Sequence, residues 1–142
     1  MTGASSRLSV TAPSGIGQIT QGDDLCAIVV DALAREGETL AASDVIVLAQ
    51  KIVSKAEGRL IDLAEIKPSI QARKLAGETE KDPRVVELIL GESQSVLRAR
   101  PGLIIVRHRL GYVLANAGID ASNVAEGQVL LLPEDPDRSC ME

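Results

Sequence analysis

The feature that most constrains this chain is a short apolar run at residues 45–49, which reads Val-Ile-Val-Leu-Ala. A run of this length, rich in β-branched residues, predicts a strand that is buried on both faces. A polar stretch follows at once and includes Gln50, Lys51, Lys55 and Arg59. In open α/β sheets, ligands bind beyond the carboxyl ends of strands, so this stretch is a candidate ligand site. Its three cations suggest an anionic ligand, and a solvated basic turn is the alternative.

The composition narrows the class of protein. With 142 residues, of which 45% are hydrophobic, the chain is long enough for one domain with its own core. A net charge of −5 argues against non-specific nucleic-acid binding, and Tyr112 is the only aromatic residue, which leaves no platform for base stacking. There is no signal-peptide pattern and no apolar run long enough to span a bilayer. We therefore expect a cytoplasmic protein that binds neither nucleic acid nor membrane.

The two cysteines, Cys26 and Cys140, are too few for a disulfide framework and lack metal-ligand spacing. Cys26 falls within a predicted helix, where a small buried side chain is its expected role. His108 lies between two arginines. We expect it to be a surface residue.

The remaining patterns predict an α/β fold in which helices pack on a mixed sheet. Residues 1–14 are small and polar and are expected to form a flexible leader, with the domain at 15–142. Helices are expected from Asp23 to Gly37, from Pro68 and from Pro83, the last two as an αα-hairpin that covers one side of the sheet. Further strands are expected at 59–63, 103–106, 112–115 and 129–132. Pro136 signals a helix that the sequence leaves little room to complete.

A second group of polar residues, Asp120, Ser122 and Asn123, follows the predicted strand at 112–115. Carboxylate and amide oxygens suit Mg²⁺, which commonly binds one or two carboxylates together with substrate phosphates. The alternative is an Asx-turn closed by Asp120 and Asn123, with no ligand. Together with the basic stretch, the group suits a metal-bridged polyphosphate, with Lys55 and Asp120 on opposite sides of one pocket. The chain has no P-loop pattern, so a nucleotide site here would be of another type.

Four blocks in fixed order carry a resemblance to a known family: GDDL at 22–25, AQKIVSKAEGR at 49–59, ANAGIDASNV at 115–124 and LLPEDPD at 131–137. With these blocks the chain resembles the coenzyme F420-0:L-glutamate ligases, the γ-glutamyl ligases of deazaflavin coenzyme biosynthesis. The resemblance runs from about residue 15 to the C-terminus. It implies the N-terminal portion of a longer family fold.

The resemblance implies a GTP-dependent ligase that uses Mg²⁺ or Mn²⁺, with K⁺ as a further cation. Such an enzyme adds L-glutamate to coenzyme F420-0 through an acyl-phosphate intermediate and associates as a homodimer. No catalytic residue is assigned. By position, Asp120 would be a metal ligand, Asn123 would contact GTP, Gln50 and Lys55 would hold phosphate or nucleotide, and the GTP loop would be lined by Ile16, Gly17, Gln18 and Ile19.

The sequence departs from the family in two places. The family loop usually carries proline and an acidic residue where this chain has Gly17 and Gln18. Family members also continue into a second half, whose Asp-Thr pair completes the metal site. Three hypotheses stay open: the N-terminal part of the ligase, a non-catalytic GTP- and metal-binding or assembly module, and an inactive fragment that exposes apolar strand edges.

Overall fold

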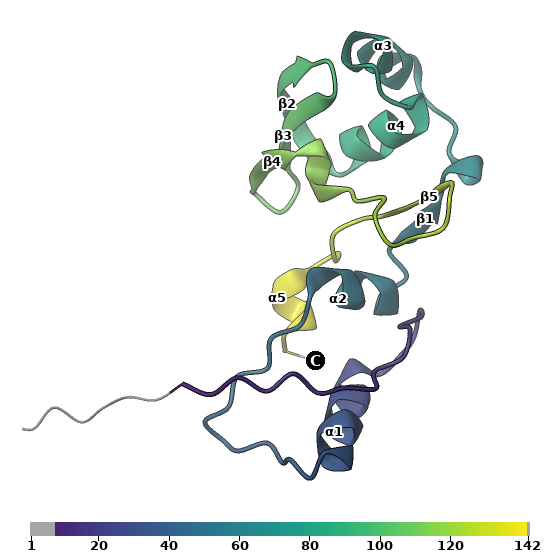
Figure 1. The fold of residues 1–142 in the computed structure, drawn as a ribbon. Coiled ribbons are helices and arrows are strands. Elements are labelled where there is room, and N and C mark those ends of the chain that lie inside the picture. Colours follow the sequence, from purple (N-terminus) through teal and green to yellow (C-terminus); the bar gives the residue numbers. More distant parts are fainter. Residues whose placement is uncertain (1–7, 142) are drawn as a thin grey trace, which may run out of the picture.

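The computed structural model describes residues 8–141, which form helices and short strands (Figure 1). The α/β class is confirmed. None of the helices in this range is long and apolar enough to cross a bilayer. In chain order the elements are α1 (Leu25–Arg35), α2 (Gln50–Ala56), β1 (Leu60–Asp62), α3 (Ile70–Thr79), α4 (Pro83–Gly91), β2 (Ser93–Arg100), β3 (Leu103–His108), β4 (Val113–Ala115), β5 (Gln128–Leu130) and α5 (Pro136–Ser139).

The main core lies between the α3–α4 hairpin and the sheet β2–β3–β4 (Figure 1). The side chains of Ser69 and Asp82 cap the two helices, and Pro83 opens α4, where its missing N–H costs nothing. This confirms the predicted αα-hairpin over a sheet face. The fully buried or nearly buried members of the core are Ala72, Ala76, Val86, Ile89, Ile104, Val106 and Ala117.

Two tight turns connect the strands of the three-stranded sheet. Pro101 and Gly102 (φ +78°) turn β2 into β3, and Gly111 (φ +88°) lies in the turn from β3 to β4. Tyr112 follows in the same turn with an exposed side chain, and its carbonyl accepts a hydrogen bond from the His108 N–H at 2.8 Å. Sequence patterns did not predict β2, whose residues are mostly polar and exposed.

A second, two-stranded ribbon pairs β1 with β5, so that Leu60 lies opposite Leu130. These strands confirm the predictions at 59–63 and 129–132, although both are shorter. All the strand pairs of residues 8–141 are antiparallel and fall into two separate sheets. The prediction of one mixed sheet is therefore wrong. The helices between the strands pack beside the sheets instead of crossing over to form parallel pairs.

The strand predicted at residues 45–49 does not form in this structure. Residues 45–48 have no helix or strand assignment, and Val45 and Val47 are 84% and 86% exposed. α2 begins directly afterwards at Gln50, so the polar stretch lies on a helix and not beyond a strand end. In Figure 1 the connection from α1 to α2 lies apart from both sheets. The prediction was wrong because no strand of residues 8–141 pairs with this run.

Smaller predictions met different outcomes. α1 forms with Asp24 as its N-cap and ends just before Gly37, as expected. Cys26 is exposed instead of buried, and the helix opened by Pro136 does form, as the short α5. Of the predicted leader, residues 8–14 carry no helix or strand and residues 1–7 lie outside the described part.

Candidate functional site

The loop at residues 15–19 is fastened at both ends. At its start, the N–H and hydroxyl of Ser14 donate to Glu36 Oε1 at 2.7 and 2.6 Å, which lowers the pKa of Glu36. Beyond its end, the N–H of Thr20 donates to Asp23 Oδ2 at 2.7 Å. The next turn docks on α2 through a hydrogen bond from the Gly22 N–H to the Ala56 carbonyl at 2.8 Å. The loop is thus held between the end of α1 and the end of α2.

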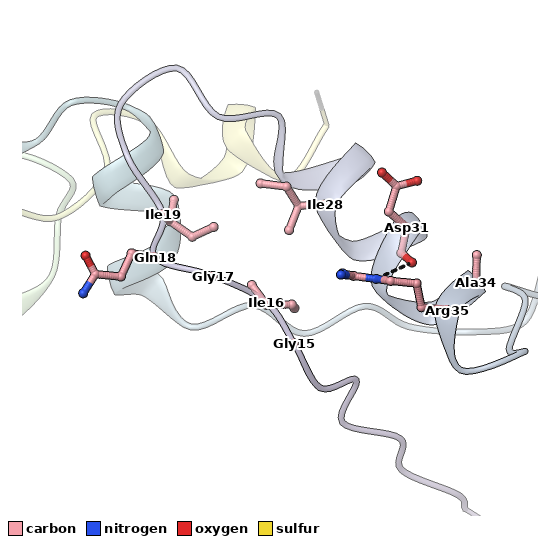
Figure 2. Close-up of a pocket in the computed structure, with 9 residues that line it drawn as sticks. All are labelled: Gly15, Ile16, Gly17, Gln18, Ile19, Ile28, Asp31, Ala34 and Arg35. Carbon is pink, nitrogen blue, oxygen red and sulfur yellow. Dashed lines mark hydrogen bonds between the residues drawn. The ribbon is translucent and has the colours of Figure 1, made fainter.

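An open surface pocket of about 680 Å³ lies between this loop and α1. Figure 2 shows Ile28 and Arg35 on the side of α1 that faces the loop, whereas the side chain of Gln18 points away from α1. The Arg35 Nε–H donates to the Asp31 carbonyl at 3.2 Å, which leaves its terminal nitrogens toward the loop. The lining residues are Gly15, Ile16, Gly17, Gln18, Ile19, Ile28, Asp31, Ala34 and Arg35.

The second part of the site is the turn that carries Asp120. Its backbone exchanges two hydrogen bonds with Leu130, at 3.0 and 2.8 Å, so the turn is attached to β5. Asp120 Oδ1 accepts from the Ser122 N–H at 2.8 Å, and Oδ2 accepts from the Ser122 hydroxyl at 2.9 Å. This confirms an Asx-turn at Asp120, with Ser122 as the residue that closes it in place of the predicted Asn123, and it orients the carboxylate.

A lysine completes this group. The Lys51 ammonium lies 2.5 Å from Asp120 Oδ2 and donates to the Ser122 hydroxyl oxygen at 2.6 Å. The hydrogen bond from Lys51, together with those from Ser122, lowers the pKa of Asp120 to about 2. Both charged side chains remain partly exposed. The turn is therefore a solvent-accessible ion pair with an ionised carboxylate at neutral pH.

The other predicted site residues lie in two places. Gln50 begins α2 and donates to the Ser54 hydroxyl at 2.5 Å, with the Leu131 carbonyl at 3.4 Å, so it sits beside the end of β5. Asn123 has a left-handed backbone (φ +59°) just past the Asp120 turn. Lys55 lies in the last turn of α2, and the ammonium that contacts Asp120 belongs to Lys51. The loop cavity is lined by none of these residues.

The described residues do not supply enough ligands for a divalent metal ion. Residues 8–141 hold no group of three or more acidic, histidine or cysteine side chains that could surround an ion. Asp120 contributes a single carboxylate, and its oxygens already accept from Lys51 and Ser122. Because Mg²⁺ requires six oxygen ligands, this donor set alone does not fit a resident metal.

Sequence patterns missed a partly buried ionic cluster around Glu92. Arg59 Nη2 lies 2.8 Å from Glu92 Oε1, and Arg109 Nε lies 3.0 Å from Oε2. Burial alone would raise the pKa of Glu92, but its hydrogen bonds and ion pairs with the two arginines outweigh burial and lower it. The same arginines donate to the carbonyls of Leu132 and Glu134 at 2.9 and 2.6 Å, so the cluster fixes the chain after β5.

His108 belongs to this cluster, and the prediction that it lies on the surface is wrong. Its side chain is fully buried, with Nε2 3.5 Å from Glu92 Oε2. Nδ1 accepts a hydrogen bond from the Leu110 N–H at 3.1 Å, which places the proton of the neutral ring on Nε2. Burial lowers the pKa of His108, against the opposing effect of Glu92. At neutral pH the ring is therefore uncharged.

Comparison with known proteins identifies the family. The model of the F420-0:Gamma-glutamyl ligase family matches residues 15–142. The chain therefore belongs to this ligase family.

Archaeal relatives show how much of such a protein the chain represents. The chain is 47% identical over 132 residues to the coenzyme F420:L-glutamate ligase of Methanothermobacter thermautotrophicus. The matched region covers 93% of this chain and 52% of that protein. The enzyme of the same name from Methanopyrus kandleri is 50% identical over 125 residues, with 88% and 48% covered. The Archaeoglobus fulgidus enzyme is 40% identical over 133 residues, with 94% and 51% covered. The chain spans about half the length of these relatives.

Proposed function

We propose that this chain supplies the nucleotide-binding part of a GTP-dependent coenzyme F420-0:L-glutamate ligase. The observation that carries the proposal is the accessible Lys51–Asp120 pair beside the end of β5. A metal–triphosphate could separate the two charges of this pair. The Asp120 carboxylate would then bind the metal cation, and the Lys51 ammonium would bind a phosphate oxygen. At 4 Å and an effective dielectric near 20, an ammonium and a phosphate charge attract by about 4 kcal/mol.

The proposed chemistry has two steps. A carboxylate oxygen of F420-0 attacks the γ-phosphorus of GTP, the bond to the β-phosphate oxygen breaks, and GDP leaves. The amine nitrogen of L-glutamate then attacks the acyl carbon. Phosphate leaves with the electron pair of the broken C–O bond, and the nitrogen loses a proton to form the amide. In this proposal the loop at residues 15–19 borders the nucleotide, and Gln50, Lys55 and Asn123 contact it. Asp120 would supply one ligand to the Mg²⁺ or Mn²⁺ ion that accompanies GTP, and that ion would neutralise phosphate charge. The proposal includes K⁺ as a further cation.

Calorimetric titration of the chain with GTP in the presence of Mn²⁺ tests the binding step. We expect saturable heat, and we expect Asp120→Asn to weaken binding at least tenfold because the metal loses its only protein carboxylate here. Asp137→Asn, which removes a carboxylate on α5, is the matched control and should leave binding unchanged. Absence of saturable heat at millimolar GTP would contradict the proposal.

A non-catalytic GTP-binding or assembly module is the second candidate, and the single carboxylate of the Asp120 turn favours it. Supplying the chain with GTP, Mn²⁺, F420-0 and L-glutamate separates the two functions. Release of GDP with amide formation supports the ligase, whereas saturable GTP binding without either product supports the module. A homodimer is part of the ligase proposal, and light scattering at increasing concentration measures it directly.

A further inference from the structure

The feature that the proposed function leaves unused is the apolar segment at residues 45–48. Val45, Ile46, Val47 and Leu48 are all exposed in this structure, although four consecutive apolar side chains in a folded protein are ordinarily covered. Alternate side chains of an extended chain point to opposite faces. The run is apolar at both alternating sets, which is the pattern of a strand covered on both sides.

The backbone of this segment is as unsatisfied as its side chains. Within residues 8–141, the nearest backbone hydrogen bonds involve Asp44 and Ala49, and the peptide groups of residues 45–48 take part in none. Unpaired N–H and C=O groups beside apolar side chains are a template for another strand. Neither sheet of the structure supplies that strand, since β1 pairs with β5 and β2, β3 and β4 pair with one another.

We propose that residues 45–48 form an inner strand in the assembled ligase. There they pair with an apolar strand from the second half of the protein, which the relatives possess. The length of the relatives points to their second half as the partner of this segment. The chain matches only 52% of the Methanothermobacter thermautotrophicus enzyme, and the remainder of that enzyme has no counterpart in this structure. The inference rests on the proposed function only in taking the ligase as the assembly. It concerns the fold and not the reaction.

The consequence for the site is positional. Ala49 joins this segment directly to α2, whose first two residues are Gln50 and Lys51. Fixing the segment in a sheet would fix the start of α2, and with it the lysine that faces Asp120 at 2.5 Å. The second half would thus place its own strand next to the candidate phosphate-binding residues.

A chimaera tests the inference: the whole chain of 142 residues followed by the second half of the Methanothermobacter thermautotrophicus enzyme. Hydrogen exchange at the amides of residues 45–48 is measured in the chain alone and in the chimaera. We expect these amides to exchange at least about tenfold more slowly in the chimaera, because strand pairing protects N–H groups. Equal exchange in both proteins would overturn the inference.

A matched pair of substitutions provides the second readout. Val47→Lys and Val10→Lys change the same residue type at 86% and 85% exposure. In the chain alone, neither should move the melting temperature by more than about 1 °C. In the chimaera, Val47→Lys should lower it by about 5 °C or more, and Val10→Lys should not. Equal effects of the two substitutions in the chimaera would contradict the inference.

The remaining outcomes also decide. If the chimaera does not fold, the two parts are co-expressed as separate chains, and failure to form a complex there would overturn the inference. Concentration-dependent protection of residues 45–48 in the chain alone would identify a second copy as the occupant and would also overturn it. A folded, protected chimaera without GTP turnover would refute the proposed function and leave this inference standing.

Discussion

At the scale of single residues, Glu92 joins elements that are far apart in the sequence. Its carboxylate meets Arg59, which precedes β1, and Arg109, which follows β3. Glu92→Gln removes the anion and leaves two partly buried guanidinium groups without a counter-charge. We expect a loss of about 2–3 kcal/mol in the free energy of unfolding, below the value for fully buried pairs because Arg109 keeps some solvent. Urea denaturation measures this.

The control for Glu92 is the ion pair between Arg84 and Asp82, whose side chains are 41% and 34% exposed. Removing a charge from an exposed pair costs little, so Arg84→Gln should change the free energy of unfolding by about 0.5 kcal/mol or less. Comparable losses for the two substitutions would show that the partly buried cluster around Glu92 contributes no more than an exposed pair.

His108 should make stability depend on pH. Burial lowers the pKa of His108 in the folded state, so the unfolded chain binds the proton more tightly. Stability is therefore fully present above the unfolded value of about 6.5 and falls as the pH drops through the lower, folded pKa. His108 is the only histidine. Urea denaturation from pH 7.5 to 5 should show this decline in the native chain and a flatter profile in His108→Gln.

Asp120 offers a direct test of which lysine it meets. Lys51→Met should raise the pKa of Asp120 from about 2 toward the ordinary value of 3.8, since the hydrogen bond from Lys51 is the main cause of the lowering. Lys55→Met, on the same helix, should leave it unchanged. Carbon-detected NMR titration of the carboxyl group gives the pKa, and a shift produced by Lys55→Met would contradict the geometry described above.

The residues also show what sequence patterns can and cannot reveal. The Asx-turn at Asp120 was predictable, because its hydrogen bonds join residues two positions apart. Lys51, which pairs with Asp120 and also donates to Ser122, lies 71 residues before Ser122 in the sequence, so no local pattern reveals it. Burial of His108 could have been predicted by extending the alternation of Ile104 and Val106 one step further, since all three lie on the same face of β3. The flanking arginines concealed that signal.

At the scale of elements, Gly118 decides how η2 (Asn116–Gly118), the short 3₁₀ helix after β4, packs. Its φ is +69°, and an added Cβ would lie 3.0 Å from the side chains of Leu114 and Leu132. Gly118→Ala should therefore lower the free energy of unfolding by about 2–3 kcal/mol, through backbone strain and overpacking together. Thermal denaturation checks the loss.

Gly37 separates the two contributions. It has a similar φ of +76° but no atom within 4 Å of an added Cβ, so Gly37→Ala should show the backbone cost alone, about 1–2 kcal/mol. If Gly37→Ala proved as costly as Gly118→Ala, packing around Gly118 would contribute nothing.

Local signals predicted the elements whose causes are local. The caps at Asp24 and Asp82 fixed two helix starts, and Pro101-Gly102 fixed a turn. β2 was missed because its residues have no strand pattern of their own; it forms as the partner that the turn requires for β3. Residues 45–49 are the opposite case, a strand pattern without a partner in the structure.

At the scale of the whole molecule, stability should be uneven. α3 and α4 share a buried core with the β2–β3–β4 sheet, whereas α1 has no extensive contact with another helix or strand of residues 8–141. Segments with few buried contacts open more easily than the core. Hydrogen exchange followed by mass spectrometry should therefore show α1 exchanging well before α3 and α4, and equal protection would contradict this picture.

The family and the α/β class could be predicted from the sequence, because ordered blocks and helix signals identify both. The division into two antiparallel sheets could not. It depends on pairings such as Leu60 with Leu130, which no local pattern encodes. The untested roles of Gln50, Lys55 and Asn123 remain predictions for the binding experiments above.

The solitary tyrosine at the turn between β3 and β4 gives this molecule a natural optical reporter. Without tryptophan or phenylalanine, all of its intrinsic fluorescence originates from Tyr112. The carbonyl of Tyr112 accepts a hydrogen bond from the His108 N–H, so the emitting residue belongs to the β3–β4 hairpin that carries His108. Opening of that hairpin can thus be followed by emission intensity in the native chain, with no added dye and no competing signal.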